Sequence, residues 1–178
     1  MWLEESRTED KVSKRAVALT SVAFFVVAPG FVAGFVPLYL TDGWTRSAST
    51  GGWLLASAGV VLIVVGVAVL VHAFAHYVLE GLGTPAPIAP TERLVVGGLN
   101  RYVRNPMYLA VVATILGQAL LLARPVLLVY AVVAFATMAA FVRRYEEPVL
   151  ARQFGAQYRD YCTDVPRWIP RMRRRSRV

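Results

Sequence analysis

Charged residues and cysteine are both scarce in this sequence. Charged residues make up 17% of its 178 residues, and Cys162 is its one cysteine, which excludes an internal disulfide and any cysteine-based metal cluster. Soluble domains carry about 25% charged residues, whereas this chain is 57% hydrophobic. It has no Ser/His/Asp or Cys/His constellation typical of hydrolases, and its glycine pairs form no dinucleotide-binding fingerprint. Its acidic and basic beginning also differs from a signal peptide.

Four long apolar runs take the place of the missing charges. They cover residues 16–40, 53–79, 107–123 and 126–142. As a helix the second run would be about 40 Å long, more than the roughly 30 Å of hydrocarbon in a bilayer. We therefore predict an all-α integral membrane protein with about four transmembrane helices, forming a single membrane domain over residues 1–178.

Proline and asparagine predict local features of these helices. Pro29 and Pro37 interrupt the first run, which a membrane helix tolerates only where neighbouring groups satisfy the freed carbonyls. Asn105 and Pro106 suit the N-cap and first position of the third helix. Arg124-Pro125 predicts a tight turn, so the third and fourth helices should form a hairpin.

The basic residues predict the orientation in the membrane. Four crossings place both termini on one side, together with the connector 81–105, and this side holds 17 of the 19 Lys and Arg residues. The positive-inside rule makes that side cytoplasmic. We expect a cytoplasmic segment 143–170 with an amphipathic helix and a disordered basic tail 171–178. The net charge of +8 is more simply explained by anionic lipid of the bilayer than by nucleic acid.

The same topology predicts a candidate site. The connector is long for a structureless loop, which favours a function, and the hairpin should bring Asn105 near Glu146 and Glu147. A helix N-terminus attracts an anion, and carboxylates attract an ammonium, so together they suit a zwitterion such as an amino acid. The alternative is that both glutamates only pair with neighbouring arginines such as Arg104.

Several separated motifs strengthen the first of these interpretations. The first motif is the segment from Glu92 to Tyr108, and a hydrophobic hairpin follows it. After the hairpin come Glu146-Glu147, then Phe154-Gly155-x-x-Tyr158-x-x-Tyr161, and then Val165-Pro166. In order and spacing, this half of the chain resembles the isoprenylcysteine carboxyl methyltransferase and phospholipid methyltransferase superfamily. The resemblance implies a membrane methyltransferase that holds S-adenosyl-L-methionine between the connector and the end of the fourth helix.

The resemblance also implies which residues hold this cofactor. Glu146 would bind the ammonium of its methionine part, Arg104 and the N–H groups around Asn105 its carboxylate, and Tyr108 would frame the sulfonium. Arg104, Asn105 and Tyr108 are thus the predicted catalytic residues. The full predicted cofactor set is Glu92, Arg93, Leu94, Val95, Asn100, Asn105, Pro106, Met107, Tyr108, Glu146 and Glu147.

The acceptor side is less defined by the sequence. The family's acceptor-orienting arginine falls at Val142, which leaves Arg143, Arg144 and His76 as predicted substrate-binding residues. His72, His76 and Glu80 share one helix face. They could line an acceptor pocket, supply a general base or be ordinary interfacial residues; nothing else in the sequence supports a metal site, and none is predicted.

These observations predict a methyltransferase acting on a lipophilic or amphiphilic small molecule that enters from the bilayer. Two alternatives remain open: an NADPH-dependent ene-reductase of the sterol-reductase type, which shares an Arg-x-Pro-x-Tyr motif but typically has Asn where Met107 stands, and a non-enzymatic membrane scaffold.

Overall fold

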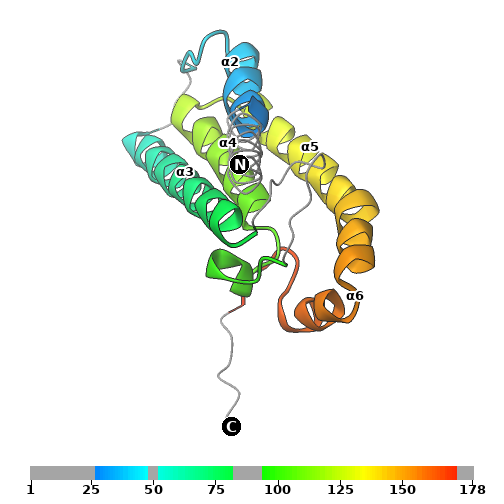
Figure 1. Cartoon of the computed structure of the whole chain (residues 1–178). Helices are drawn as coiled ribbons and strands as arrows, with labels where there is room; N and C mark the ends of the chain where they lie inside the picture. The colour runs from blue at the N-terminus through cyan, green and yellow to red at the C-terminus, as the bar shows by residue number, and fades with distance from the viewer. Residues whose placement is uncertain (1–26, 48–51, 82–93, 172–178) are drawn as a thin grey trace, which may run out of the picture.

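The computed structural model describes residues 27–47, 52–81 and 94–171, and within these ranges every regular element is a helix. Figure 1 shows three helices side by side, with α4 (Pro106–Leu122) between α3 (Trp53–Gly81) and α5 (Val126–Phe141). The chain between residues 27 and 40 is helical and includes the π-helix η1 (Phe31–Phe35) and α2 (Val36–Leu40). The all-α prediction is confirmed for the described residues, and the predicted helix bounds 53–79, 107–123 and 126–142 hold to within two residues.

The α4–α5 hairpin forms for the reasons that its sequence suggests. Asn105 occupies the N-cap position of α4 and Pro106 its first position, although the Asn105 side chain makes no capping hydrogen bond. α4 ends at Leu122, and the following C-cap residue Ala123 adopts a left-handed conformation with φ 53°. Three residues separate α4 from α5, so the two helices run back along each other and pack against one another.

Glycine brings α3 and α4 into close contact. A Cβ atom at Gly117 would lie 2.7 Å from the Ile63 side chain and 2.8 Å from the Gly59 carbonyl oxygen. One at Gly66 would lie 2.6 Å from the hydroxyl of Thr114. Small residues that let backbones approach in this way are typical of helix pairs in membranes, where packing rather than water drives association.

Pro37 reshapes the first helix, and two distant side chains compensate. Proline has no N–H to donate, and the residues before it form the π-helix η1. Gln118 on α4 donates to the carbonyl oxygen of Ala33 at 2.6 Å, and Tyr130 on α5 donates to that of Val32 at 2.8 Å. The requirement that neighbouring groups satisfy the carbonyls before Pro37 is therefore met; Pro29, the second interrupting proline, lies within the helical residues.

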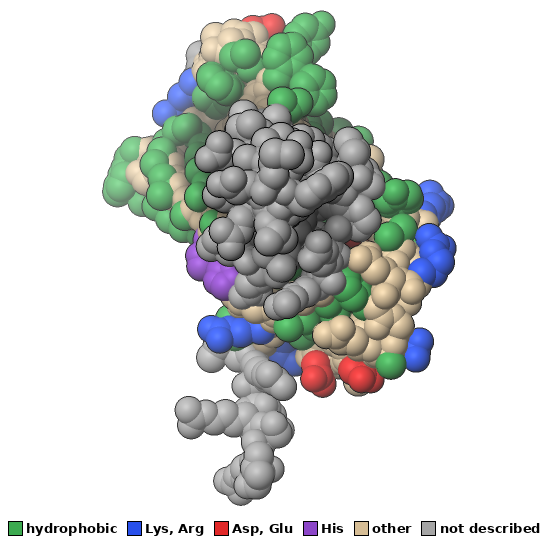
Figure 2. Space-filling view, viewed as in Figure 1, with side chains coloured by type: hydrophobic (Ala, Val, Ile, Leu, Met, Phe, Trp, Pro, Cys, Tyr) green, Lys and Arg blue, Asp and Glu red, His purple; other side chains and the backbone are tan. Residues whose placement is uncertain are grey.

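Apolar side chains cover the outside of the helices as well as their contacts. Ile115 and Leu127 are fully buried, but Val61 and Val64 on α3 and Val132 on α5 are each more than 60% exposed. Figure 2 shows apolar side chains over α3 and charged ones near α6. Two helical stretches, Trp53–His76 and Val126–Asp164, are long and apolar enough to cross a membrane, and Val27–Leu40 and Pro106–Leu122 are shorter apolar helices. The exposed apolar faces are those of a membrane protein; four crossings stay a prediction.

After α5 the chain turns across the end of the hairpin. The π-helix η3 (Val142–Glu146) joins α5 directly to α6 (Glu147–Asp164), the amphipathic helix expected in segment 143–170, which is kinked where Gly155 takes φ 53°. Residues 165–171 then run back to α4, and we call them the strap. Arg171, the first residue of the predicted disordered tail, instead donates its backbone N–H to the Tyr102 carbonyl oxygen at 3.0 Å. The rest of the predicted tail, residues 172–178, lies outside the described ranges.

Candidate functional site

A pocket opens where α4 begins and where η3 and α6 follow α5. Its enclosed volume is about 60 Å³, and the rest of the hollow is open to solvent. The residues before and at the start of α4 form one wall, and η3 and α6 form the other. Its lining consists of Leu94, Val95, Asn100, Arg104, Asn105, Pro106, Met107, Tyr108, Val142, Glu146, Glu147, Leu150, Tyr158 and Tyr161.

Glu146 presents a carboxylate to this pocket. Its Oε2 accepts a hydrogen bond from the Tyr108 hydroxyl at 2.9 Å, across the gap between η3 and α4. Burial raises the pKa of Glu146 above its ordinary value, the Tyr108 bond lowers it, and the charge of Glu147 raises it. A carboxylate that has lost part of its hydration in this way gains most from a cation that enters the pocket.

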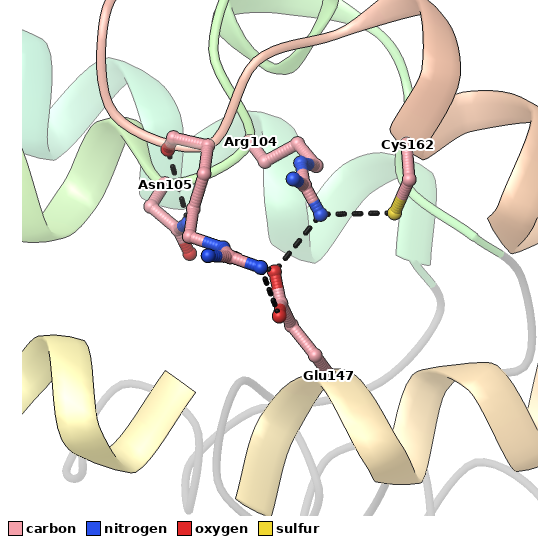
Figure 3. Close-up of polar contacts among 5 residues, drawn as sticks. Arg104, Asn105, Glu147 and Cys162 are labelled. Atoms are coloured by element: carbon pink, nitrogen blue, oxygen red, sulfur yellow. Dashed lines mark hydrogen bonds and ion pairs between the residues drawn. The ribbon is translucent and has the colours of Figure 1, made fainter. Parts of the chain in front are cut away.

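Glu147 has a different role, because two arginines occupy its carboxylate. Arg167 of the strap donates from Nε and Nη2 to both oxygens at 2.7 Å, and Arg104 donates from Nη1 to Oε1 at 2.9 Å. The bonds to Glu147 raise the pKa of Arg167. Figure 3 shows Arg104 between Glu147 and Cys162, whose Sγ lies 2.9 Å from the same Nη1. For Glu147, pairing with arginines is thus what the structure shows.

The strap forms hydrogen bonds with the residues at the start of α4. Asn105 donates its side-chain N–H to the Arg167 carbonyl at 3.1 Å, and Arg104 donates its backbone N–H to Pro166 at 2.9 Å. Trp168 packs edge-on against Tyr108 and against Phe135 of α5, with ring centroids 6.5 and 5.0 Å apart. The segment 165–170 therefore connects α4, α5 and α6 at one point.

Two tyrosines of α6 close the other side of the pocket. Tyr161 donates its hydroxyl to the Asn100 carbonyl oxygen at 2.7 Å, which ties α6 to the 3₁₀-helix η2 (Gly98–Arg101). Burial raises the pKa of both Tyr158 and Tyr161, so both hydroxyls stay protonated at neutral pH. They give this wall a flat, uncharged aromatic surface.

Most of the predicted cofactor residues meet in this pocket. Its lining includes every one of them within the described ranges, namely Leu94, Val95, Asn100, Asn105, Pro106, Met107, Tyr108, Glu146 and Glu147, together with the predicted catalytic Arg104. Glu92 and Arg93 lie outside those ranges. The sequence prediction missed Val142, Leu150, Tyr158 and Tyr161 as lining residues. Helical spacing contains the signal, because Leu150 lies one turn beyond Glu146 and Tyr158 lies one turn before Tyr161.

The three predicted substrate-binding residues do not line the pocket. Arg143 and Arg144 are exposed on η3. His76 lies against Gly98, where a Cβ would approach its ring to 2.9 Å, and its ring centroid is 5.1 Å from that of His72. Their role in acceptor binding stays a prediction. Among the described residues no group of His, Cys, Asp and Glu is arranged to hold a metal ion.

The polar atoms left over in the pocket indicate what it can bind. Arg104 Nε is buried, and no described residue accepts its hydrogen. Buried donors in folded proteins almost always have a partner, so an acceptor from a ligand fits here. Glu146 supplies an acceptor and a negative charge on the facing wall. A donor beside a helix start, opposite a carboxylate, matches a ligand that carries both a carboxylate and an ammonium.

Comparison with known protein families gives a match over more than half of the chain. Residues 54–157 match the model of the phospholipid methyltransferase family, a match that includes α3, α4, α5 and the first part of α6. No curated protein matches the chain.

Proposed function

The chain belongs to the phospholipid methyltransferase family, and on that premise we propose that it is an S-adenosyl-L-methionine-dependent methyltransferase acting in the membrane. The pocket between Tyr108 and Glu146 carries this proposal, because it combines a desolvated carboxylate with an unsatisfied guanidinium donor. This pair of groups suits the amino-acid part of the cofactor.

Each wall of the pocket has a part in holding the cofactor. Glu146 binds the ammonium, and Arg104 Nε, with the N–H groups at the start of α4, binds the carboxylate. Leu94, Val95 and the tyrosines of α6 offer apolar and aromatic surface to the adenosine. When bound, the cofactor supplies an electrophilic methyl group on a sulfonium. Catalysis by the protein then consists of aligning the acceptor with that methyl group and excluding water.

The acceptor in this proposal is a lipophilic or amphiphilic small molecule that arrives from the bilayer. We place the protein as a multi-pass protein with four crossings, both termini in the cytoplasm and the pocket at the cytoplasmic interface, because 17 of its 19 basic residues then lie on that side. The cofactor reaches the pocket from water while the acceptor moves in from the lipid. In this arrangement the cofactor and the acceptor approach the start of α4 from opposite sides, one from water and one from lipid.

Ligand titration of the purified chain in detergent tests this function. We expect saturable binding of S-adenosylhomocysteine and none of NADPH. Glu146→Gln should weaken binding by about 2–4 kcal/mol, because the ammonium loses a charge-assisted partner. Asp160→Asn is the matched control, since Asp160 is exposed on the same helix as Leu150 and outside the pocket.

Two outcomes would contradict the proposal. Saturable binding of NADPH alone would indicate the reductase, and binding of neither ligand would indicate the scaffold. Where S-adenosylhomocysteine binds, the chain in membranes should be incubated with radiolabelled methyl donor. Label recovered in the lipid fraction, rather than in protein or volatile products, is the result expected for a lipophilic acceptor.

A further inference from the structure

A second hollow lies between α3 and α4, and Pro106 is the one described residue that it shares with the pocket above. We call it the α3–α4 groove. Nearly all of its exposed lining surface is apolar. The lining residues are Val65, Gly66, Val69, Leu99, Tyr102, Val103, Pro106, Leu109, Ala110, Ala113, Pro170 and Arg171.

The groove has an interfacial end and an apolar end. Tyr102, Pro170 and Arg171 lie before α4 or in the strap, whereas Leu109 and Ala113 lie further along α4. From Pro106 to Ala113 the groove follows α4 for about 10 Å, roughly a third of the hydrocarbon thickness. In the orientation proposed above, it therefore leads from the cytoplasmic interface into the acyl-chain region.

Positive charge gathers at the interfacial end. Arg171 lines the groove, and its backbone is held there by the hydrogen bond to Tyr102. The guanidinium of Arg101 lies 4.8 Å from the centre of the Tyr102 ring. Within the described part of the chain Arg171 forms no ion pair. Four further arginines follow it in the sequence.

An apolar groove whose interfacial end includes Arg171, with the Arg101 guanidinium against the ring of its lining residue Tyr102, is complementary to a lipid with a negatively charged headgroup. We propose that the α3–α4 groove binds an anionic phospholipid, with one acyl chain along α3 and α4 and its phosphate beside Arg101 and Arg171. Arginine binds phosphate well because its planar fork of donors matches the phosphate oxygens. The inference rests on the proposed membrane orientation but not on methyl transfer.

Photolabelling in lipid nanodiscs tests this proposal. The full chain is placed in discs of phosphatidylcholine containing a small fraction of a probe lipid with a diazirine on its acyl chain. The probe is either phosphatidylglycerol or phosphatidylcholine with identical chains, and labelled peptides are mapped by mass spectrometry. We expect the anionic probe to label the facing sides of α3 and α4 more strongly than the neutral probe does.

Two pairs of variants make the test specific. Arg171→Gln should lower labelling of the groove by the anionic probe about fivefold, whereas Arg152→Gln, exposed on α6, should not. Ala113→Phe fills the groove and should abolish labelling there, whereas Ala136→Phe on the exposed face of α5 should not. Because Arg171 is exposed, its substitution keeps the test valid even where the Ala113 variant fails to fold.

Three results would overturn the proposal: equal labelling by the two probes, label spread evenly over the outer faces of the helices, or an equal loss with Arg171→Gln and Arg152→Gln. The last would mean that general surface charge, and not the groove, attracts the lipid. Titration of S-adenosylhomocysteine on the same samples reports on the proposed enzyme separately, so failure of one proposal leaves the other standing.

Discussion

Replacing Arg167 with Gln removes the contact between the strap and Glu147, the first residue of α6. The wild-type guanidinium makes two hydrogen bonds of 2.7 Å to Glu147, whose side chain is 17% exposed. Hydrogen bonds to charged groups contribute about 1.5–3 kcal/mol each, and breaking a fully buried ion pair costs about 3–5 kcal/mol. Arg167 is itself 31% exposed, so solvent screens part of this loss. We expect a decrease of about 2–3 kcal/mol in the free energy of unfolding.

A double-mutant cycle with Glu147→Gln isolates this contact. Reversible unfolding in mixed detergent micelles gives the free energies of the wild type, both single variants and the double variant. We expect a coupling energy of about 2 kcal/mol, because the second substitution removes a partner that is already lost. Arg159→Gln, exposed on α6, is the control for charge alone. A coupling energy below about 0.5 kcal/mol would refute the claim that this pair holds the strap.

Three further predictions concern Glu146, Gly117 and Gln118. Acidification should weaken S-adenosylhomocysteine binding, because protonated Glu146 cannot attract an ammonium. Since the pKa of Glu146 is raised, this loss of affinity should begin at a higher pH than it would with an ordinary glutamate. A pH series of titrations should show no such loss for Glu146→Gln. Gly117→Ala should lower the free energy of unfolding, measured by thermal unfolding, by about 1–3 kcal/mol through overpacking. Gly34→Ala, with open space around it, should not lower it. Gln118→Leu should lower the free energy of unfolding by about 0.6–1.7 kcal/mol. The loss should be smaller in a chain that also carries Pro37→Ala, because the alanine restores a backbone donor.

Local chemistry allowed much of the fold to be predicted from the sequence. Pro106 suits the first position of a helix because of a rule that acts within one turn, and the apolar runs are long enough to identify their helices. It was also predictable that neighbouring groups must bond the carbonyl oxygens freed by Pro37, but which groups do so was not. Gln118 and Tyr130 come from 85 and 98 residues away, and only the tertiary packing of the three helices reveals them.

The candidate site shows the same division. The motifs predicted one site containing Glu146 and Tyr108, and the structure places both side chains in one pocket, while their role in binding a cofactor stays a prediction. Adjacent glutamates look equivalent in a sequence, and both line the pocket, yet Glu146 accepts a hydrogen bond from Tyr108 while Glu147 pairs with Arg104 and Arg167. Their difference depends on the helical phase of η3 and on where the strap returns, which are long-range properties.

The strap also determines when the site becomes complete during synthesis. Chains fold from the N-terminal side as they are made, so α3 and the α4–α5 hairpin can associate while residues 165–171 are still untranslated. Asn105 and Arg104 receive their partners Arg167 and Pro166 more than 60 residues later. The helices of a nascent chain can therefore pack together before the strap contacts the start of α4.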